Sequence, residues 1–226
     1  NTVILGPSGT GKSVLLKHIV GLLRPDRGEV YFDDQRVDNL DERDMVPIRK
    51  RIGFLFQMGA LFDSMTVGAN VQFPLVEHTK MSLADRIDRC NTVLRMVGLP
   101  GIDRKMPAEL SGGQRKRVAL ARAVVLGPDL VLYDEPTTGL DPIRSDVINE
   151  LIVTLNQKLG ITSIVVTHDM VSARKIAHRM VMLFDGKIAA DGPPETILNS
   201  RHERVQRFIQ GVADQEDIQR IHEGFD

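Results

Sequence analysis

A glycine-rich octapeptide near the start of the chain has the composition and spacing of a phosphate-binding loop. It matches the Walker A pattern in full and consists of Gly6, Pro7, Ser8, Gly9, Thr10, Gly11, Lys12 and Ser13. The glycines allow the backbone to wrap closely around phosphate oxygens. Lys12 would reach the β- and γ-phosphates of a nucleotide, and the Ser13 hydroxyl would bind Mg²⁺. The alternative, a turn with an exposed lysine, is disfavoured because the loop follows a strand-like segment and opens a helical pattern.

Two adjacent carboxylates and one histidine could supply the chemistry that accompanies phosphate binding. Asp134 and Glu135 follow the apolar run Leu130–Tyr133, and ligands bind at the carboxyl ends of strands in an open α/β sheet. Asp134 would hold Mg²⁺ through its water shell, whereas Glu135 should point elsewhere, because side chains alternate along a strand, and would polarise the attacking water. His168 also follows a strand and would lie within reach of a γ-phosphate. The structural alternatives are a solvated strand end and a surface histidine.

A second glycine-containing motif begins an expected helix far along the chain. Its residues are Leu110, Ser111, Gly112, Gly113 and Gln114. We interpret Ser111 as an N-cap, and the two glycines leave the amides bare at the start of a helix that runs to about Val125. Such a helix start binds anions, and Arg115, Lys116 and Arg117 add positive charge close behind it. The alternative is a capped helix start without a ligand.

The elements that must position these residues alternate between strand and helix. A helix is expected over Lys12–Leu22, and a mostly helical segment over residues 58–127. Strands are expected at Thr2–Leu5, Glu29–Phe32, Ile52–Phe56, Leu130–Tyr133, Ile161–Val166 and, as the last one, Met180–Phe184. This order predicts an α/β fold with a parallel sheet and a helical insert.

Helical periodicity and capping residues predict three further helices. The first spans Ser82–Val97, with a capping box formed by Ser82 and Asp85 and with apolar residues at Leu83, Ile87, Cys90, Leu94 and Val97. The second begins with Asp141 as the N-cap and Pro142 at the first helical position. Its expected buried stripe is Ile143, Val147, Ile148, Leu151, Ile152 and Leu155. A third, amphipathic stretch near the end carries Val205, Phe208, Ile209 and Val212, and an acidic end follows it.

The bulk composition excludes several classes of protein. The 226 residues suit one large domain, and 42% hydrophobic with 26% charged residues is the balance of an ordinary soluble globular protein. A net charge of -1 provides no overall field that would attract nucleic acid, so no nucleic-acid partner is expected. No apolar run is long enough to suggest a membrane span. The single cysteine, Cys90, cannot form an internal disulfide and fits a reducing compartment.

Taken together, the octapeptide, the Asp134–Glu135 pair and the LSGGQ motif resemble the ATPases of the ABC family over essentially the whole chain. The resemblance implies a P-loop NTPase fold, with a RecA-like parallel sheet and an inserted helical subdomain, that binds ATP and Mg²⁺. It assigns Gln57 to the Q-loop, which contacts Mg²⁺ and water and signals to a transmembrane partner. It assigns Gly139, Leu140 and Asp141 to the D-loop, which crosses the dimer interface, and His168 to the switch histidine.

The same resemblance implies why one chain carries two anion sites. In the family two cassettes pack head to tail as a dimer, and ATP lies between the glycine-rich loop of one subunit and the Ser111 loop of its partner. One ABC domain is implied, with its core in residues 1–57 and 128–200, its helical subdomain in 58–127 and a C-terminal extension in 201–226. Cassettes of this family carry an upstream antiparallel segment with an aromatic residue that stacks on adenine, and we expect that segment to be missing here.

Two segments resemble a narrower group, the ATPases of Mce-type (Mla, toluene-tolerance) bacterial lipid transport systems. One runs from Gln57 to Val67, where Ala60, Leu61 and Phe62 could line a groove for a permease helix or simply pack the helical insert. The other is residues 204–214, which in the resembled systems belong to an extension that reaches toward the second ATPase. The implied partners are an identical subunit, an integral-membrane permease, and Mce-domain and small accessory subunits. The implied location is the cytoplasmic face of the bacterial inner membrane.

Other functions remain open at this point. A DNA-repair or chromosome-structure ATPase is disfavoured because the stretch between Gln57 and Ser111 is too short for a coiled coil. A translation-associated protein would carry two cassettes, and one is found. A regulator without catalysis is disfavoured by the presence of Lys12, Glu135 and His168. Among transporters, the second candidate is an importer of small polar solutes such as amino acids.

Overall fold

The fold is built on one six-stranded sheet, and the computed structural model describes residues 1–213. Each strand pairing is parallel except that of the last two strands, which is antiparallel. In spatial order the strands are β4 (Ile52–Leu55), β5 (Leu130–Asp134), β6 (Thr162–Thr167), β1 (Thr2–Leu5), β7 (Arg179–Phe184) and β8 (Lys187–Gly192). The expected α/β fold is confirmed, but Met180–Phe184 is not the last strand, because β8 adds an antiparallel edge.

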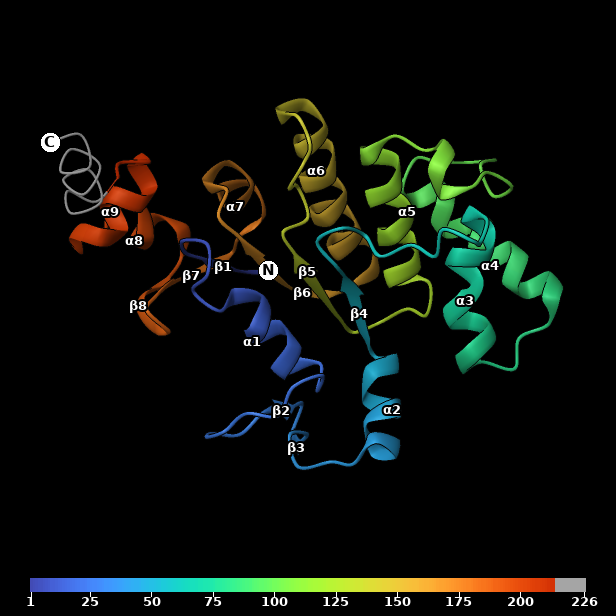
Figure 1. Ribbon diagram of the computed structural model, residues 1–226, viewed down its shortest axis with the longest axis horizontal. Helices are drawn as coiled ribbons and strands as arrows, with labels where there is room; N and C mark the ends of the chain where they lie inside the picture. Colours follow the sequence, from blue (N-terminus) through green and yellow to red (C-terminus); the bar gives the residue numbers. More distant parts are fainter. Residues whose placement is uncertain (214–226) are drawn as a thin grey trace, which may run out of the picture.

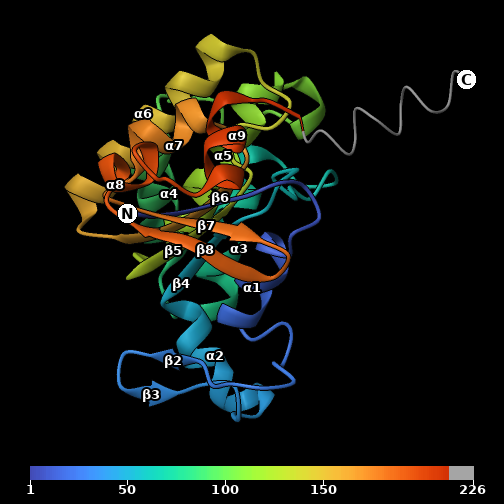
Figure 2. The same ribbon diagram turned by 90° about the vertical axis from the view of Figure 1, so that its left-hand side faces the viewer.

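Alternating side chains of the central strands belong to two separate hydrophobic cores. On β1, Val3 and Leu5 lie in one core, the main core, with helices α5 (Gly112–Val124), α6 (Pro142–Leu159) and α7 (Met170–Ile176). Ile4 lies in the other core with α1 (Lys12–Ile19) and α2 (Glu42–Lys50), on the opposite face of the sheet (Figure 2). On β5, Tyr133 joins the first core and Leu132 the second. A strand that is covered on both faces has no polar face, which is why the central strands are continuous apolar runs. Because β1, β5 and β6 pair in parallel, their carboxyl ends lie at the same edge of the sheet, and this edge carries the candidate site.

The segment between β1 and β4 contains two helices and a small separate hairpin. Helix α1 (Lys12–Ile19) is shorter than expected because Gly21 takes a left-handed conformation with φ of 71°. The expected strand at Glu29–Phe32 is only the two-residue β2 (Tyr31–Phe32), which pairs with β3 (Gln35–Arg36) outside the main sheet. Helix α2 (Glu42–Lys50) leads from the hairpin into β4.

Between β4 and β5 the chain forms a run of helices at one side of the sheet, away from β8 (Figure 1). These are α3 (Val67–His78), α4 (Leu83–Met96), the 3₁₀ turn η1 (Pro107–Glu109) and α5 (Gly112–Val124). In α4 the Ser82 hydroxyl caps the Asp85 amide as expected, but the Asp85 carboxylate accepts from the same hydroxyl, so the expected capping box is wrong. Leu83 and Ile87 are exposed, contrary to the predicted apolar face.

The remaining helices pack on the face of the sheet that carries the core of Val3 and Leu5, and beside the β7–β8 edge. Helix α6 begins as expected, with the Asp141 carboxylate accepting from the Arg144 amide. Its predicted buried stripe is wrong at Ile143, which is 79% exposed, and at Val147, which is 46% exposed. The helices are α6 (Pro142–Leu159), α7 (Met170–Ile176), α8 (Pro194–Leu198) and α9 (Glu203–Gln210).

Helix α9 is the amphipathic stretch expected near the end of the chain. Val205 is fully buried, Phe208 and Ile209 pack against the main core, and Val212 is 55% exposed, so the apolar face ends before Val212. The acidic end of the predicted extension, residues 214–226, lies outside the described residues. Within residues 1–213, none of the helices is both long enough and apolar enough to cross a bilayer.

Candidate nucleotide site

The loop between β1 and α1 folds tightly around its own lysine. Gly9 and Gly11 take positive φ angles of 82° and 90°, and an added Cβ at Gly6 would lie 2.2 Å from the Leu183 carbonyl oxygen of β7. The buried Lys12 ammonium donates to the carbonyls of Gly6 and Pro7, each at 2.8 Å. Burial lowers the pKa of Lys12, and the nearby Glu135 and Asp134 oppose that shift. The loop thus holds a positive charge at a helix start, which is an arrangement that attracts phosphate.

Ser13 and Asp134, two expected Mg²⁺ ligands, lie together. The Ser13 hydroxyl donates to Asp134 Oδ1 at 2.7 Å, although the two residues are far apart in sequence. Mg²⁺ prefers oxygen donors and usually combines one or two protein ligands with substrate phosphates and water. The residues described here contain no cluster of three or more His, Cys, Asp or Glu side chains that would hold a metal alone. The donor set therefore fits a magnesium ion that arrives with a nucleotide.

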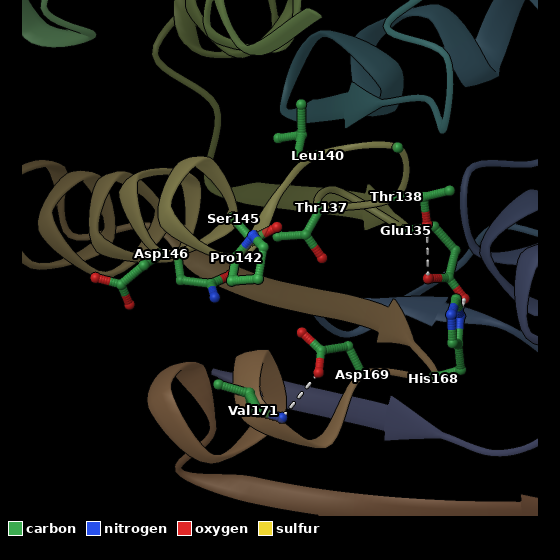
Figure 3. Close-up of a pocket in the computed structure, with 12 residues that line it drawn as sticks. Glu135, Thr137, Thr138, Leu140, Pro142, Ser145, Asp146, His168, Asp169 and Val171 are labelled. Carbon is green, nitrogen blue, oxygen red and sulfur yellow. Dashed lines mark hydrogen bonds and ion pairs between the residues drawn. The ribbon is translucent and has the colours of Figure 1, made fainter.

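Glu135 and His168 face each other at the ends of β5 and β6 (Figure 3). His168 Nδ1 lies 3.0 Å from Glu135 Oε1, and the hydroxyls of Thr138 and Thr167 both donate to Glu135 Oε2 at 3.3 Å. The expectation that side-chain alternation along β5 sets the direction of the Glu135 side chain is wrong. The strand ends at Asp134, and Glu135 takes a left-handed conformation with φ of 48°. Residues in that conformation are uncommon outside functional sites and tight turns.

A buried hydroxyl and amide network beside this pair was not predicted from the sequence. Ser172 lies at its centre: the Asn149 amide donates to its hydroxyl at 2.9 Å, and that hydroxyl donates to Asp169 at 2.5 Å and lies 3.4 Å from the Thr137 hydroxyl. Asn149 Oδ1 has no hydrogen-bond partner among the described residues. The network joins the segment after Glu135 to the helix after His168. Its members come from the segment after Glu135, from α6 and from α7 with its N-cap, and they form no motif in the sequence. The only sequence signal was that Thr137 and Asp169 follow motif residues closely.

The Ser111 loop has the reciprocal cap that its sequence allows. The Ser111 hydroxyl accepts from the Gln114 amide at 3.3 Å, and the Gln114 side chain accepts from the Ser111 amide at 2.9 Å. Added Cβ atoms at Gly112 and Gly113 would lie 3.7 Å from Leu140 and 3.6 Å from Arg144. The start of α5 therefore lies against the segment that leads into α6. Gln114 caps the helix with its side chain, so the amides of Gly112 and Gly113 are the candidate anion donors at this helix start.

The three cations after this loop were expected to add positive charge to it, and one of them does not. Arg115 donates to the Leu110 carbonyl of the motif itself. Arg117 donates to the carbonyls of Val97 and Gly98 and lines the same hollow as Ser111. Lys116 is buried and donates to the Gln57 carbonyl, so the expectation is wrong for Lys116, whose ammonium points into the protein.

Most of the expected site residues line three separate hollows in a single chain. The first hollow lies beside the glycine-rich loop and is lined by Pro7, Ser8, Gly9, Thr10 and Gly11 together with residues of β7 and α9. The second contains Ser111, Gly113 and Gln114, and the two hollows share no residue. Glu135, Gly139, Leu140 and His168 line a third hollow of about 390 Å³, and the D-loop residue Asp141 caps α6 beside it. Gln57 is exposed at the end of β4.

The groove expected near Ala60 exists, with one correction. Ala60 and Phe62 line a hollow of about 420 Å³, whose other apolar lining includes Phe54, Phe56 and Phe73. The rings of Phe54 and Phe56 stack at 4.1 Å between centroids, and Phe56 and Phe62 are 36% and 41% exposed. Leu61 packs against the main core instead of lining the groove.

Comparison with known proteins places this geometry in one family. Residues 1–138 match the ABC transporter family. The phospholipid transport ATP-binding protein MlaF of Haemophilus influenzae is 46% identical over 94% of this chain and 81% of its own length. MlaF of Escherichia coli K12 is 43% identical over 94% of this chain and 79% of its length. The probable ribonucleotide transport protein mkl of Mycobacterium leprae is 44% identical, and this chain spans 60% of its length.

Solved structures agree. The dimeric post-hydrolysis cassette MJ0796 bound to ADP and Pi has a TM-score of 0.78 and 38% identity, with 85% of this chain and 84% of that chain covered. The cassette cbiO1 of Clostridium perfringens has a TM-score of 0.79 and 31% identity, with 92% and 86% covered. The chain therefore belongs to the ABC transporter family and is an ATP-binding, ATP-hydrolysing cassette.

Proposed function

We propose that this cassette drives a bacterial phospholipid transport system from the cytoplasmic face of the inner membrane. The support is the identity to two proteins named as intermembrane phospholipid transport ATPases, each matched over about four-fifths of its length. Its partners in this proposal are an identical subunit, an integral-membrane permease, and Mce-domain and accessory subunits. The core is residues 1–57 and 128–200, the helical subdomain is 58–127, and the extension begins at 201.

The observation that carries the mechanism is that the glycine-rich loop and the Ser111 loop, the two proposed anion sites, line separate hollows of one chain. Each can complete the other's site only if two copies pack head to tail with ATP between them. ATP then favours the closed pair, because it binds that arrangement better than the open one. The cassette MJ0796, which is 38% identical to this chain, is dimeric in a post-hydrolysis state bound to ADP and Pi. Loss of the γ-phosphate removes the bridge, and the pair reopens.

Within the closed pair, the residues of the site take distinct roles. Lys12 and the amides of the glycine-rich loop hold the β- and γ-phosphates, and the partner subunit's Ser111 loop contacts the γ-phosphate from the other side. Glu135 orients the attacking water, and His168 fixes the Glu135 carboxylate through the 3.0 Å contact. Asp141 lies in the segment that crosses between subunits.

Magnesium belongs to this proposal as a cofactor. Ser13, Asp134 and Gln57 would hold Mg²⁺, which neutralises phosphate charge when it is bound. Of these, Ser13 and Asp134 are already in contact, whereas Gln57 lies at the end of a neighbouring strand. Gln57 therefore has to join the other two ligands when the nucleotide arrives.

The groove lined by Phe56, Ala60 and Phe62 is our proposed permease contact. Much of its lining is apolar, Phe56 and Phe62 are exposed, and these groove residues lie on either side of Gln57 in the chain. A helix seated there would press on the segment that carries Gln57, which gives the permease a route to the nucleotide site.

The test of the hydrolytic assignment is Glu135→Gln, which keeps the side-chain volume and removes the charge. We expect ATP binding to remain within about threefold of wild type, while turnover falls at least about a hundredfold, because only the transition state needs the oriented water. Phosphate release and nucleotide binding are measured on the same preparation, with the exposed Lys158→Met as the control. Turnover near the wild-type rate in Glu135→Gln would contradict the assignment.

The substrate is tested by purifying the intact complex from membranes. A permease with an Mce-domain partner and bound phospholipid supports the proposal. A periplasmic amino-acid receptor among the subunits would instead identify an importer of small polar solutes, and bound ribonucleotides would favour the function named for mkl.

A further inference from the structure

Lys116 is a buried cation that none of the roles above uses. It lies on α5, only 7% exposed, five positions after the Ser111 cap. Its ammonium donates to the backbone carbonyl of Gln57 and lies 3.4 Å from the backbone carbonyl of Glu135. One side chain therefore contacts the segments that carry the proposed magnesium ligand and the residue that orients water.

A second cation of α5 holds the same segment a few residues further on. Arg122 donates to the carbonyls of Gly59 and Ala60, at 2.9 Å and 2.8 Å. Gly59 and Ala60 both have positive φ angles, of 79° and 48°, and an added Cβ at Gly59 would lie 3.4 Å from Ala119 of α5. The turn after Gln57 therefore lies directly on α5, with its carbonyls directed at the two cations.

Burying an ammonium costs free energy unless hydrogen bonds replace its water shell. Burial lowers the pKa of Lys116, and the nearby Asp134 and Glu135 carboxylates oppose that shift. The two backbone carbonyls compensate directly, and a charged donor bonds a carbonyl more strongly than a neutral one does. The contact is thus specific, and neither carbonyl can move away without leaving a buried charge short of a partner.

We propose that Lys116 is a positioning residue for ATP hydrolysis, which ties helix α5, and with it the Ser111 loop, to the backbone of Gln57 and Glu135. Movement of α5 on closure of the pair would then carry both residues to their working positions. This inference rests on the roles proposed above for Gln57 and Glu135. In this inference Lys116 acts through those two segments, whose backbone carbonyls it contacts.

The test compares Lys116→Met, which keeps the length of the side chain without the charge, with Lys116→Arg, which keeps a cationic donor. We expect Lys116→Met to lower kcat by about tenfold with the KM for ATP within about twofold, because positioning matters in the transition state and not in nucleotide binding. Lys116→Arg should recover most of kcat. Lys158→Met, on the exposed face of α6, should leave both constants unchanged.

A double-mutant cycle separates positioning from a merely structural role. If Lys116 acts through Gln57, Lys116→Met should cost clearly less in a Gln57→Ala background than in wild type, because effects of coupled residues do not add. A variant that lowers the unfolding temperature but keeps wild-type kcat per folded subunit would overturn the inference. If Lys116→Met does not yield folded protein, Lys116→Gln, which keeps a neutral donor, carries the same comparison.

Failure of this inference is distinguishable from failure of the proposed function. Wild-type kcat in Lys116→Met, with Glu135→Gln inactive, would overturn the role of Lys116 and leave the hydrolytic site standing. Wild-type turnover in Glu135→Gln would overturn the site itself.

Discussion

Motif residues can be recognised from sequence because their chemistry depends on close neighbours in the chain. The loop around Lys12 and the cap at Ser111 are of this kind, and the structure has both. Residues outside such motifs, whose surroundings come from distant elements, could not be recognised. Lys116 was expected to face an anion and instead points at the Gln57 carbonyl, and Ser172 had no signal at all. The spacing of residues along the sequence does not reveal that the Lys116 side chain of α5 is covered by the segments that follow β4 and β5.

Asp38, in the hairpin region before α2, provides a prediction about how stability depends on pH. Its carboxylate accepts from Arg36 and from the Val30 amide, and these bonds lower its pKa from 3.8 to about 2. Because the folded pKa lies below the unfolded one, the stabilisation is fully present above pH 4 and is lost as the pH falls toward 2. The carboxyl titration is measured by NMR, and urea midpoints are measured between pH 5 and 3 at steps of about half a unit.

The matched variant is Asp38→Asn, which lacks the titrating group. The difference in the free energy of unfolding between wild type and this variant should shrink as the pH falls from 5 to 3. A difference that stays constant, or an Asp38 carboxyl that titrates near 4, would contradict the account of the hairpin.

Helices and strands were predictable where an apolar run or a capping residue marks them. The burial of single side chains was less predictable, because it depends on which other element packs against them. The central strands and the caps of α4, α5 and α6 were found from their residues. The exposed Ile143 and Leu83 were not, because periodicity identifies an apolar face but not how much of it another element covers. Strand β8 was missed because its sequence, at an exposed edge, has no apolar run.

The loop before α3 depends on a single buried amide, which gives a stability prediction. Asn70 is fully buried, accepts from the Phe62 amide at 2.8 Å, and donates to the carbonyls of Phe62, Met65 and Thr66. Asn70→Ala should lower the free energy of unfolding by about 2 kcal/mol or more, because several backbone groups lose their partner. Urea denaturation measures the change.

The control for this variant is Asn199→Ala, which removes an exposed bond to the Glu195 carbonyl at the end of α8. We expect a change of at most about 0.5 kcal/mol there. Equal effects of the two substitutions would show that Asn70 does not hold the loop.

For the whole molecule, the arrangement of the two anion sites is the feature that matters. The glycine-rich loop lies beside β7 and α9, whereas the Ser111 loop lies beside α6, toward the other side of the sheet (Figure 1). Residue patterns indicated each site separately, and only the resemblance to the ABC family implied that they meet across two subunits. The proposed contact forms between two copies of the chain, so the pairing of subunits is the claim on which the mechanism depends.

The most direct test is the molecular mass of Glu135→Gln in solution, measured by sedimentation velocity with and without ATP and Mg²⁺. We predict a monomer without nucleotide and a dimer with it, because slow turnover leaves ATP in place as the bridge between subunits. Adding Ser111→Glu, which sets a negative charge against the phosphate, should return the protein to the monomer while ATP still binds. A protein that stays monomeric with ATP bound, even at high concentration, would contradict the account.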